Sequence, residues 1–339
     1  MTLYIFYFSS AAVTTTDLTK HLSRRHFIRC LTALSLSPWL PGCESLFARR
    51  IAIAAHAWPG YEFLFLAQRE KWLDSSLVDL METTSATESL SALIEGKIDG
   101  AALTLDEVLT TRASGLPLTV VLVFNISAGA DMLLARPYIV KSADLKGQRI
   151  GFEKGTVGSL LLHKALDAAG LSMAEITAVP LTIDAHFQAW QQQKVDALVT
   201  YDPIASRLLR EGAIKLFDSR KIPDTIFDVL AFRTDRLDFS RSPAIRHLVS
   251  AHLKAFEHLT KNPQDAAYRM APRFKLSPAQ VLGTYKGLVI PDRSNNRRLL
   301  EGSSPILLDS ARNLSIFMYE SGKLPHENDL TDLIDPSYL

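Results

Sequence analysis

Acidic side chains recur at positions where a ligand could meet them. They are Glu62, Asp106, Asp131, Asp202 and Asp228, and few basic residues accompany them. Carboxylates attract a cation or a hydrogen-bond donor, and they disfavour a bare anion because burying an unpaired charge is costly. We therefore expect a cationic or hydrogen-bond-donating ligand in preference to a simple anion. With Trp58 and Tyr61 nearby, an amine-bearing or heteroaromatic, pyrimidine-like compound fits better than nitrate or a simple sulfonate.

Aromatic residues adjoin the same region. Trp58 and Tyr61 flank a Pro-Gly pair, and large rings in a loop can stack on a flat or apolar ligand. The alternative is that these rings cap the core beneath the loop. Tyr201 is a further candidate for ligand contact, whereas Asp202 beside it is expected to cap the helix that begins at Pro203.

Two glycine-containing segments supply further candidates. The segment 155–159 opens a helix, and free N–H groups at a helix start, together with the helix dipole, can hold an anionic or polar group. Thr156 and Gly158 are therefore candidates for ligand binding, with a plain glycine turn as the alternative. Ser127 and Gly129 follow an expected strand and are candidates as well.

No residue pattern in the chain is typical of an enzyme. Gly-x-Ser-x-Gly, His-Glu-x-x-His and cysteine clusters are all absent from the sequence. The two cysteines are Cys30 and Cys43, and His163 and His186 lack metal-ligand spacing. We therefore expect no catalytic residue, no metal and no cofactor.

The N-terminal segment has the layout of an export signal. A basic patch at 23–29 precedes an apolar run at 31–40, which has about half of the ~20 residues that span a bilayer. Ser-Arg-Arg-His-Phe-Ile-Arg resembles the twin-arginine export motif, although general secretion stays open. Leu-Pro-Gly-Cys43 resembles a bacterial lipobox, which implies a signal peptide of residues 1–42 and a diacylglyceryl anchor on the Cys43 sulfur. The alternative is a buried amphipathic first helix.

Charge and length exclude some classes of function. The formal net charge is +1, with +3 in residues 1–42 and −2 in the remainder. The part of the chain after residue 42 is therefore nearly neutral, and it lacks the basic surface that nucleic-acid binding needs. A chain of 339 residues, 47% of them hydrophobic, is large enough for two lobes with separate cores.

Strands and helices alternate from residue 50, which predicts a mainly parallel sheet with helices on both faces. The first block is expected to have strands at 50–55, 77–81, 98–104 and 118–124, and helices at 63–70, 105–112 and from a cap at Thr87 or Ser89 to Gly96. The second block is expected to have strands at 149–152, 177–179, 197–200 and 214–217, and helices at 155–169, 185–192 and 203–211. After Arg233 we expect helices only.

Two internal repeats organise these blocks. Lys97-Ile98-Asp99 and Lys194-Val195-Asp196 each precede a strand, and the segments 131–136 and 228–233 share the form Asp-x-Leu-x-x-Arg. We interpret the second pair as paired strands along which the chain crosses to another lobe and returns, with chance similarity as the alternative. Their aspartates could then satisfy hinge backbone groups instead of touching ligand. Lobe one is expected to comprise residues 43–134 and 229–339, and lobe two residues 135–228.

Three segments carry a family resemblance: Ser-Ala-Asp-Leu-Lys-Gly-Gln-Arg-Ile-Gly (142–151), Lys-Val-Asp-Ala-Leu-Val-Thr-Tyr-Asp-Pro (194–203) and Ile-Pro-Asp-Thr-Ile-Phe-Asp-Val-Leu (222–230). They are similar to ABC-transporter substrate-binding proteins of the nitrate/sulfonate/taurine and thiamine-pyrimidine (NMT1/THI5-like) group. The resemblance covers about residues 50–290. It implies an α/β, type II periplasmic-binding-protein fold, in which two lobes joined by two crossover strands enclose a ligand. A pyrimidine synthase of the same family uses a cysteine-rich motif that this chain lacks.

The resemblance also implies partners and a location. The partners would be a small-molecule ligand and the permease and ATPase subunits of an ABC importer, at the periplasmic or outer face of the cell membrane. In open α/β sheets, ligands bind beyond the carboxyl ends of the strands. We see no dimerisation signal and expect a monomer. Nitrate, sulfonate or taurine is the alternative ligand, and a ligand-sensing module of a signalling system is the alternative function.

Overall fold

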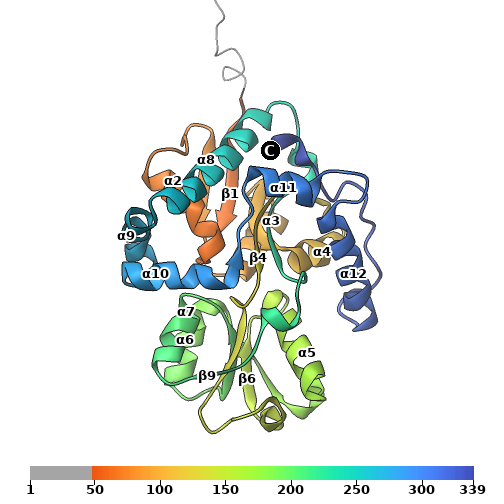
Figure 1. Cartoon of the computed structure of the whole chain (residues 1–339). Coiled ribbons are helices and arrows are strands. Elements are labelled where there is room, and N and C mark those ends of the chain that lie inside the picture. Colours follow the sequence, from red (N-terminus) through yellow and green to blue (C-terminus); the bar gives the residue numbers. More distant parts are fainter. Residues whose placement is uncertain (1–47) are drawn as a thin grey trace, which may run out of the picture. The chain divides into compact units, whose positions relative to one another are not determined.

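The computed structural model describes residues 48–339. The export signal and the lipidation site at Cys43 lie outside the described residues. Within them the chain forms two lobes, each built on its own sheet, and the lobe with the smaller sheet is green in Figure 1. Among residues 48–339, no helix is both long and apolar enough to cross a membrane.

The first lobe is built on a six-stranded mixed sheet in the order β2-β1-β3-β10-β4-β11. Its strands are β1 (Ile51–Ala55), β2 (Val78–Glu82), β3 (Gly100–Thr104), β4 (Leu118–Ser127), β10 (Phe227–Arg233) and β11 (Leu288–Val289). β1 pairs in parallel with β2 and β3, whereas β10 runs antiparallel between β3 and β4. The short strand β11 departs from the expectation of helices only after Arg233, because a two-residue strand leaves no periodic pattern to recognise.

The second lobe repeats this arrangement in a five-stranded sheet of order β7-β6-β8-β5-β9. Its strands are β5 (Met132–Ala135), β6 (Arg149–Phe152), β7 (Thr177–Pro180), β8 (Ala197–Thr200) and β9 (Ile214–Asp218). β6 pairs in parallel with β7 and β8, and β5 runs antiparallel between β8 and β9. The antiparallel strand therefore takes the same place in both sheets.

This equivalence explains the two internal repeats. Asp99 directly precedes β3 and Asp196 directly precedes β8, the third strand in each sheet order. Each carboxylate accepts a hydrogen bond from a backbone N–H of the neighbouring strand: Asp99 from Ala52 N at 2.8 Å, and Asp196 from Arg149 N at 2.9 Å. The Asp-x-Leu-x-x-Arg repeats form β5 and β10. The interpretation of these two as paired strands is wrong, because they lie in different sheets.

The chain crosses between the lobes at residues 128–131 and 219–226, just before β5 and β10. The lobe boundaries at 134 and 228 stay predictions; by strand pairing, the five-stranded sheet already includes Met132 and the six-stranded sheet already includes Phe227. The two crossings are hydrogen-bonded to each other: Ser127 Oγ and Ser219 Oγ lie 2.7 Å apart, and Ser219 N donates to Asp131 O at 3.0 Å. These contacts join the two crossings.

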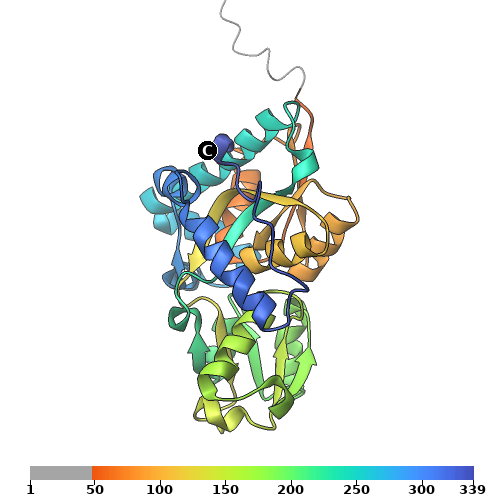
Figure 2. The same cartoon turned by 90° about the vertical axis from the view of Figure 1, so that its right-hand side faces the viewer.

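Helices cover both faces of the six-stranded sheet (Figures 1 and 2). One face carries α2 (Glu62–Arg69), α8 (Ser242–Lys261), α9 (Pro263–Phe274) and α10 (Pro278–Thr284); the other carries α3 (Ala86–Ile94), α4 (Leu105–Ala113), α11 (Arg293–Leu300) and α12 (Ile306–Glu320). On β10, Val229 and Ala231 pack into one core and Leu230 and Phe232 into the other, which is why this strand reads as an apolar run.

In the second lobe, α5 (Val157–Ala169) packs on one face of the sheet, and α6 (Ile183–Gln191) and α7 (Ile204–Arg210) pack on the other. Gly170 ends α5 in the left-handed conformation at φ 68°, as helix-ending glycines do. The cap of α3 is Ser85, whose side chain accepts from Glu88 N. The cap expected at Thr87 or Ser89 is therefore wrong, because a residue one turn earlier already satisfies the first free N–H groups.

Candidate ligand-binding pocket

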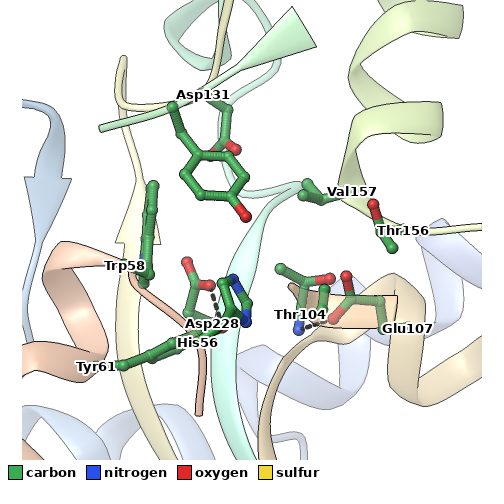
Figure 3. Close-up of a pocket in the computed structure, with 11 residues that line it drawn as sticks. His56, Trp58, Tyr61, Thr104, Glu107, Asp131, Thr156, Val157 and Asp228 are labelled. Atoms are coloured by element: carbon green, nitrogen blue, oxygen red, sulfur yellow. Dashed lines mark hydrogen bonds between the residues drawn. The ribbon is translucent and has the colours of Figure 1, made fainter. Parts of the chain in front are cut away.

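A pocket lies between the lobes, beyond the carboxyl ends of β1 and β3, and residues from both lobes line it (Figure 3). The lining residues are His56, Trp58, Tyr61, Ala86, Thr104, Glu107, Asp131, Thr156, Val157, Tyr201 and Asp228. Its cavity volume is about 10 Å³, which is about the room of one water molecule. The site in this structure is closed.

The loop after β1 supplies the aromatic wall. Trp58 is fixed by a hydrogen bond from its Nε1 to Asn125 Oδ1 at 3.0 Å, and the Tyr201 ring meets it edge-on, with centroids 5.1 Å apart. Gly60 allows this approach, since a Cβ there would lie 1.7 Å from Asn125 Oδ1. The edge-on Tyr201 ring and the small free volume leave no space for a heterocycle against Trp58, so the structure does not support the heteroaromatic part of the expected ligand.

Asp228, on β10, is held by two strong donors. Tyr61 Oη donates to its Oδ1 and Asn125 Nδ2 to its Oδ2, both at 2.6 Å. Burial and the nearby Asp131 raise the pKa of Asp228 well above its ordinary value. The Asp228 side chain is thus a fixed part of the pocket wall, and it does not serve hinge backbone groups.

Glu107 enters the pocket from the first turn of α4. Its Oε2 accepts from Thr104 N at 2.8 Å, which caps the helix directly after β3. Burial, together with the neighbouring Asp106, raises the pKa of Glu107 well above its ordinary value. Its other oxygen, Oε1, has no hydrogen-bond partner.

Asp131 enters from the first crossing segment. Burial raises its pKa to about 7, so near neutral pH a modest change in its surroundings decides whether it is charged. Its Oδ2 has no hydrogen-bond partner. Burial lowers the pKa of His56 to about 3, which leaves that ring neutral. No Lys or Arg lines the described pocket.

Unpartnered polar atoms are concentrated in this pocket. Five of its eleven lining residues carry a buried side-chain atom without a hydrogen-bond partner. They are His56 Nδ1, Thr104 Oγ1, Glu107 Oε1, Asp131 Oδ2 and Tyr201 Oη. Buried polar groups are almost always hydrogen-bonded in folded proteins because leaving one unpaired costs about 1–3 kcal/mol. A polar ligand group placed here could form hydrogen bonds with these atoms.

Contacts between the lobes keep the pocket closed. Thr87, at the start of α3, donates from N (2.9 Å) and Oγ1 (2.5 Å) to Glu153 Oε1 on the other lobe. In a second contact, Lys323 Nζ, beyond the end of α12, donates to Ser159 O in α5 at 3.0 Å. Figure 2 shows α12 reaching down to the second lobe.

Half of the residues proposed from sequence for ligand binding line the pocket. The candidates that line it are Trp58, Tyr61, Thr156, Tyr201 and Asp228. Thr156 serves also as the cap of α5, since its Oγ1 accepts from Gly158 N at 3.3 Å. As expected, the neighbouring Asp202 caps a helix, because its Oδ1 accepts from Ser206 N at 2.8 Å.

The other five lie elsewhere. Glu62 is buried in α2 and paired with Arg273, which anchors α9. Ser127 and Gly129 take part in the contacts that join the two crossings, where Gly129 N donates to Ser219 Oγ at 2.6 Å. Gly158 lies inside α5, packed against the Glu153 backbone. Asp106 lines a neighbouring cavity.

Sequence reasoning did not single out His56, Ala86, Thr104, Glu107 or Val157 as pocket residues. It placed Asp131 in the acidic set that a ligand could meet, with contacts to hinge backbone groups as the alternative. The signal for Glu107 was present, because Thr104-x-x-Glu107 at a strand end has the sequence pattern of a capping box, and the glutamate half of that pattern forms here, with Glu107 Oε2 accepting from Thr104 N. Ala86 and Val157 carry no polar group, so only the folded arrangement shows their place.

Comparison with known proteins yields one family and a consistent set of folds. The family model described as NMT1/THI5 like matches residues 63–266. An Escherichia coli (strain K12) protein named "Putative aliphatic sulfonates-binding protein" is 28% identical over 219 residues, which cover 64% of this chain and 68% of the relative.

Two solved structures show the same fold. The alkanesulfonate-binding protein SsuA from Xanthomonas axonopodis pv. citri, bound to MOPS, superposes with a TM-score of 0.72 at 21% identity, covering 84% of this chain and 98% of that one. The periplasmic aliphatic sulphonate binding protein SsuA from Escherichia coli gives a TM-score of 0.67 at 23% identity, covering 84% and 97%. The fold is that of periplasmic binding proteins.

Proposed function

Because the chain belongs to the NMT1/THI5-like family and has the periplasmic-binding-protein fold, we propose that it is the extracytoplasmic solute-binding component of an ABC importer. The two lobes close on a small polar solute and the closed form delivers it to a membrane permease driven by ATPase subunits. The protein does no chemistry on the solute. The chain works as a monomer, held at the membrane by a lipid on Cys43.

The observation that carries this proposal is the cluster of five buried, unpartnered polar atoms at the lobe interface. Those atoms come from both lobes, because Thr104 and Glu107 lie on the first lobe and Tyr201 on the second. A solute that satisfies them stabilises the closed state, which is the differential contact that a binding protein needs. Among residues 48–339, the pocket includes no cysteine and no group of metal-ligating side chains.

The chemistry of the pocket favours a solute with an amino or ammonium group. Glu107 and Asp131 each present an oxygen without a partner, and the lining includes no Lys or Arg that would hold an anion. The free volume of about 10 Å³ suits one small donor group, and a heterocycle exceeds it.

An alkanesulfonate is the second candidate solute, and the printed names of the sulfonate-binding relatives favour it. The raised pKa of Asp131 makes sulfonate binding physically feasible, because a protonated carboxyl can donate a hydrogen bond to an anion. The two candidates therefore differ in the protonation state they require of the same carboxyls.

The test is a thermal-shift panel of hexylamine, taurine, butanesulfonate and nitrate on the mature protein, with native mass spectrometry of a gently purified sample. A solute at about 100 times its Kd adds about 2.7 kcal/mol of stability, which is easily measured. Stabilisation by hexylamine supports the amine assignment. Stabilisation by butanesulfonate or nitrate alone overturns it in favour of anion binding, and no stabilisation by any solute, with none co-purified, overturns solute binding itself.

A further inference from the structure

A second cavity adjoins the pocket and has a volume of about 290 Å³. It lies between α4, α5 and the segment that follows α12. Its lining residues are Asp106, Thr110, Phe152, Lys154, Gly155, Thr156, Ser159, Leu160, His163, Met173, Met318 and Lys323. Its size is near the lower end of the range for small-molecule sites.

The walls of this cavity are largely apolar. Phe152 and Leu160 come from the second lobe and Met318 from the first. Met173 adds a second flexible thioether, and methionines of this kind adapt to ligands of varied shape. An apolar chain would therefore gain free energy by leaving water for this space.

Two opposite charges face the cavity without meeting each other. Asp106 is 4% exposed, and its Oδ1 has no hydrogen-bond partner. Lys323 Nζ donates to Ser159 O, whereas an ammonium group has three donors. Among the described residues no ion pair within 4.0 Å joins Lys323 to a carboxylate, and burial lowers its pKa to about 8. An acidic group bound beside Lys323 would use the remaining donors.

The cavity and the pocket are neighbours. Thr156 lines both, and Asp106 and Glu107, adjacent on α4, line one each. The pocket has room for one small group only, so the remainder of any larger solute needs another space. The adjoining cavity supplies it.

We propose that this cavity is a second compartment of the ligand site, which takes an apolar chain that carries a carboxylate to Lys323. This inference rests on the proposed function, and it deepens it: the amino group of the solute lies at Glu107 and Asp131, and the carboxylate end lies in the cavity. The solute class is then an ω-amino acid with a short alkyl chain.

Chain length and charge can be tested separately by calorimetry with simple probes. Affinity should rise from butylamine to hexylamine, and from γ-aminobutyrate to ε-aminocaproate, by up to about fourfold per methylene buried. The carboxylate of ε-aminocaproate should add about tenfold over hexylamine through its charge-assisted bond to Lys323.

Lys323→Met should remove that preference, so that ε-aminocaproate and hexylamine bind with similar affinity. A lysine that serves only as a contact between the lobes would weaken both probes by the same factor, so the ratio separates the two roles. Lys164→Met is the matched control. Lys164 also lies on the α5–α12 boundary, 3.2 Å above the Phe317 ring, but it does not line the cavity.

Thr110→Phe should fill the cavity and abolish the dependence on chain length, whereas Thr110→Val, which keeps the volume, should preserve it. Both variants are compared at matched folded fraction. A different result would overturn the second compartment and leave the amine assignment standing. In that result hexylamine binds with an affinity that does not depend on chain length, and neither Lys323→Met nor Thr110→Phe changes the ratio of the affinities for ε-aminocaproate and hexylamine. If no amine binds, the proposed ligand itself fails.

Discussion

At the scale of residues, the pocket combines groups that are satisfied with groups that are not. Both oxygens of Asp228 are hydrogen-bonded, by Tyr61 and Asn125. Glu107 and Asp131 each keep one oxygen free. The first arrangement holds the pocket wall in place, and the proposed function assigns ligand affinity to the second, so substitutions in the two groups should affect different measurements.

Tyr61→Phe should lower the free energy of unfolding by about 1–3 kcal/mol, because Asp228 Oδ1 would stay buried without its donor. Urea denaturation measures the change. Tyr285→Phe is the control, since that hydroxyl donates only to the Met270 sulfur, a weak acceptor. Equal losses of unfolding free energy in the two variants would show that the hydrogen bond to Asp228 contributes no more to stability than the bond to Met270.

The affinity for hexylamine should rise with pH. Asp131 has a raised pKa of about 7 in the free, closed protein, and it must release its proton to pair with an ammonium group. Below that pKa the affinity should gain up to about tenfold per pH unit for each proton released, and it should level off above it, while the amine itself stays charged.

Asp131→Asn should flatten this profile below neutral pH, although Glu107 and Asp228, whose pKa values are also raised by burial, would leave a residual slope. Calorimetry in buffers of different ionisation enthalpy counts the protons directly. Affinity for butanesulfonate that falls as pH rises would instead identify protonated carboxyls as donors to an anion.

At the scale of elements, the periodic patterns made most of the fold predictable. β6 and β8 have the expected bounds, and α5 ends at Gly170 as expected. β10 illustrates what could not be derived: its apolar run indicates a strand buried on both faces, but its sheet depends on which strands it meets in space. Glu62 illustrates the same limit for the site, since its partner Arg273 is distant in sequence.

Closure depends on contacts between elements of the two lobes. Glu153→Ala removes the acceptor for Thr87 N and Oγ1, so it should shift the free protein toward an open form with a larger radius of gyration in small-angle X-ray scattering. Glu88→Ala is the control, because Glu88 accepts only from Thr84 near the start of its own helix. An unchanged scattering curve for Glu153→Ala would show that this contact does not hold the lobes together.

At the scale of the whole molecule, the two lobes are variations on one arrangement. The sheet orders β2-β1-β3-β10-β4 and β7-β6-β8-β5-β9 match position by position, and Asp99 and Asp196 perform the same backbone role in each. The crossings place the carboxyl edges of the two sheets face to face. One pocket thereby receives side chains from both lobes, and the proposed function predicts that ligand binding is coupled to closure.

The proposed role also includes a membrane anchor that keeps the protein near its permease, and the resemblance of Leu-Pro-Gly-Cys43 to a lipobox predicts that Cys43 carries it. Cys43→Ser should release the protein from the membrane fraction, because a diacylglyceryl group supplies two acyl chains and a single chain gives only marginal binding. Cys30→Ser is the matched control: it alters the other cysteine of the chain and should leave the protein membrane-bound. Membrane fractionation with mass spectrometry of the N-terminal peptide measures both. A Cys43→Ser protein that remains membrane-bound would contradict lipid anchoring while leaving the proposed ligand capture untouched, since that proposal rests on lining residues within 48–339.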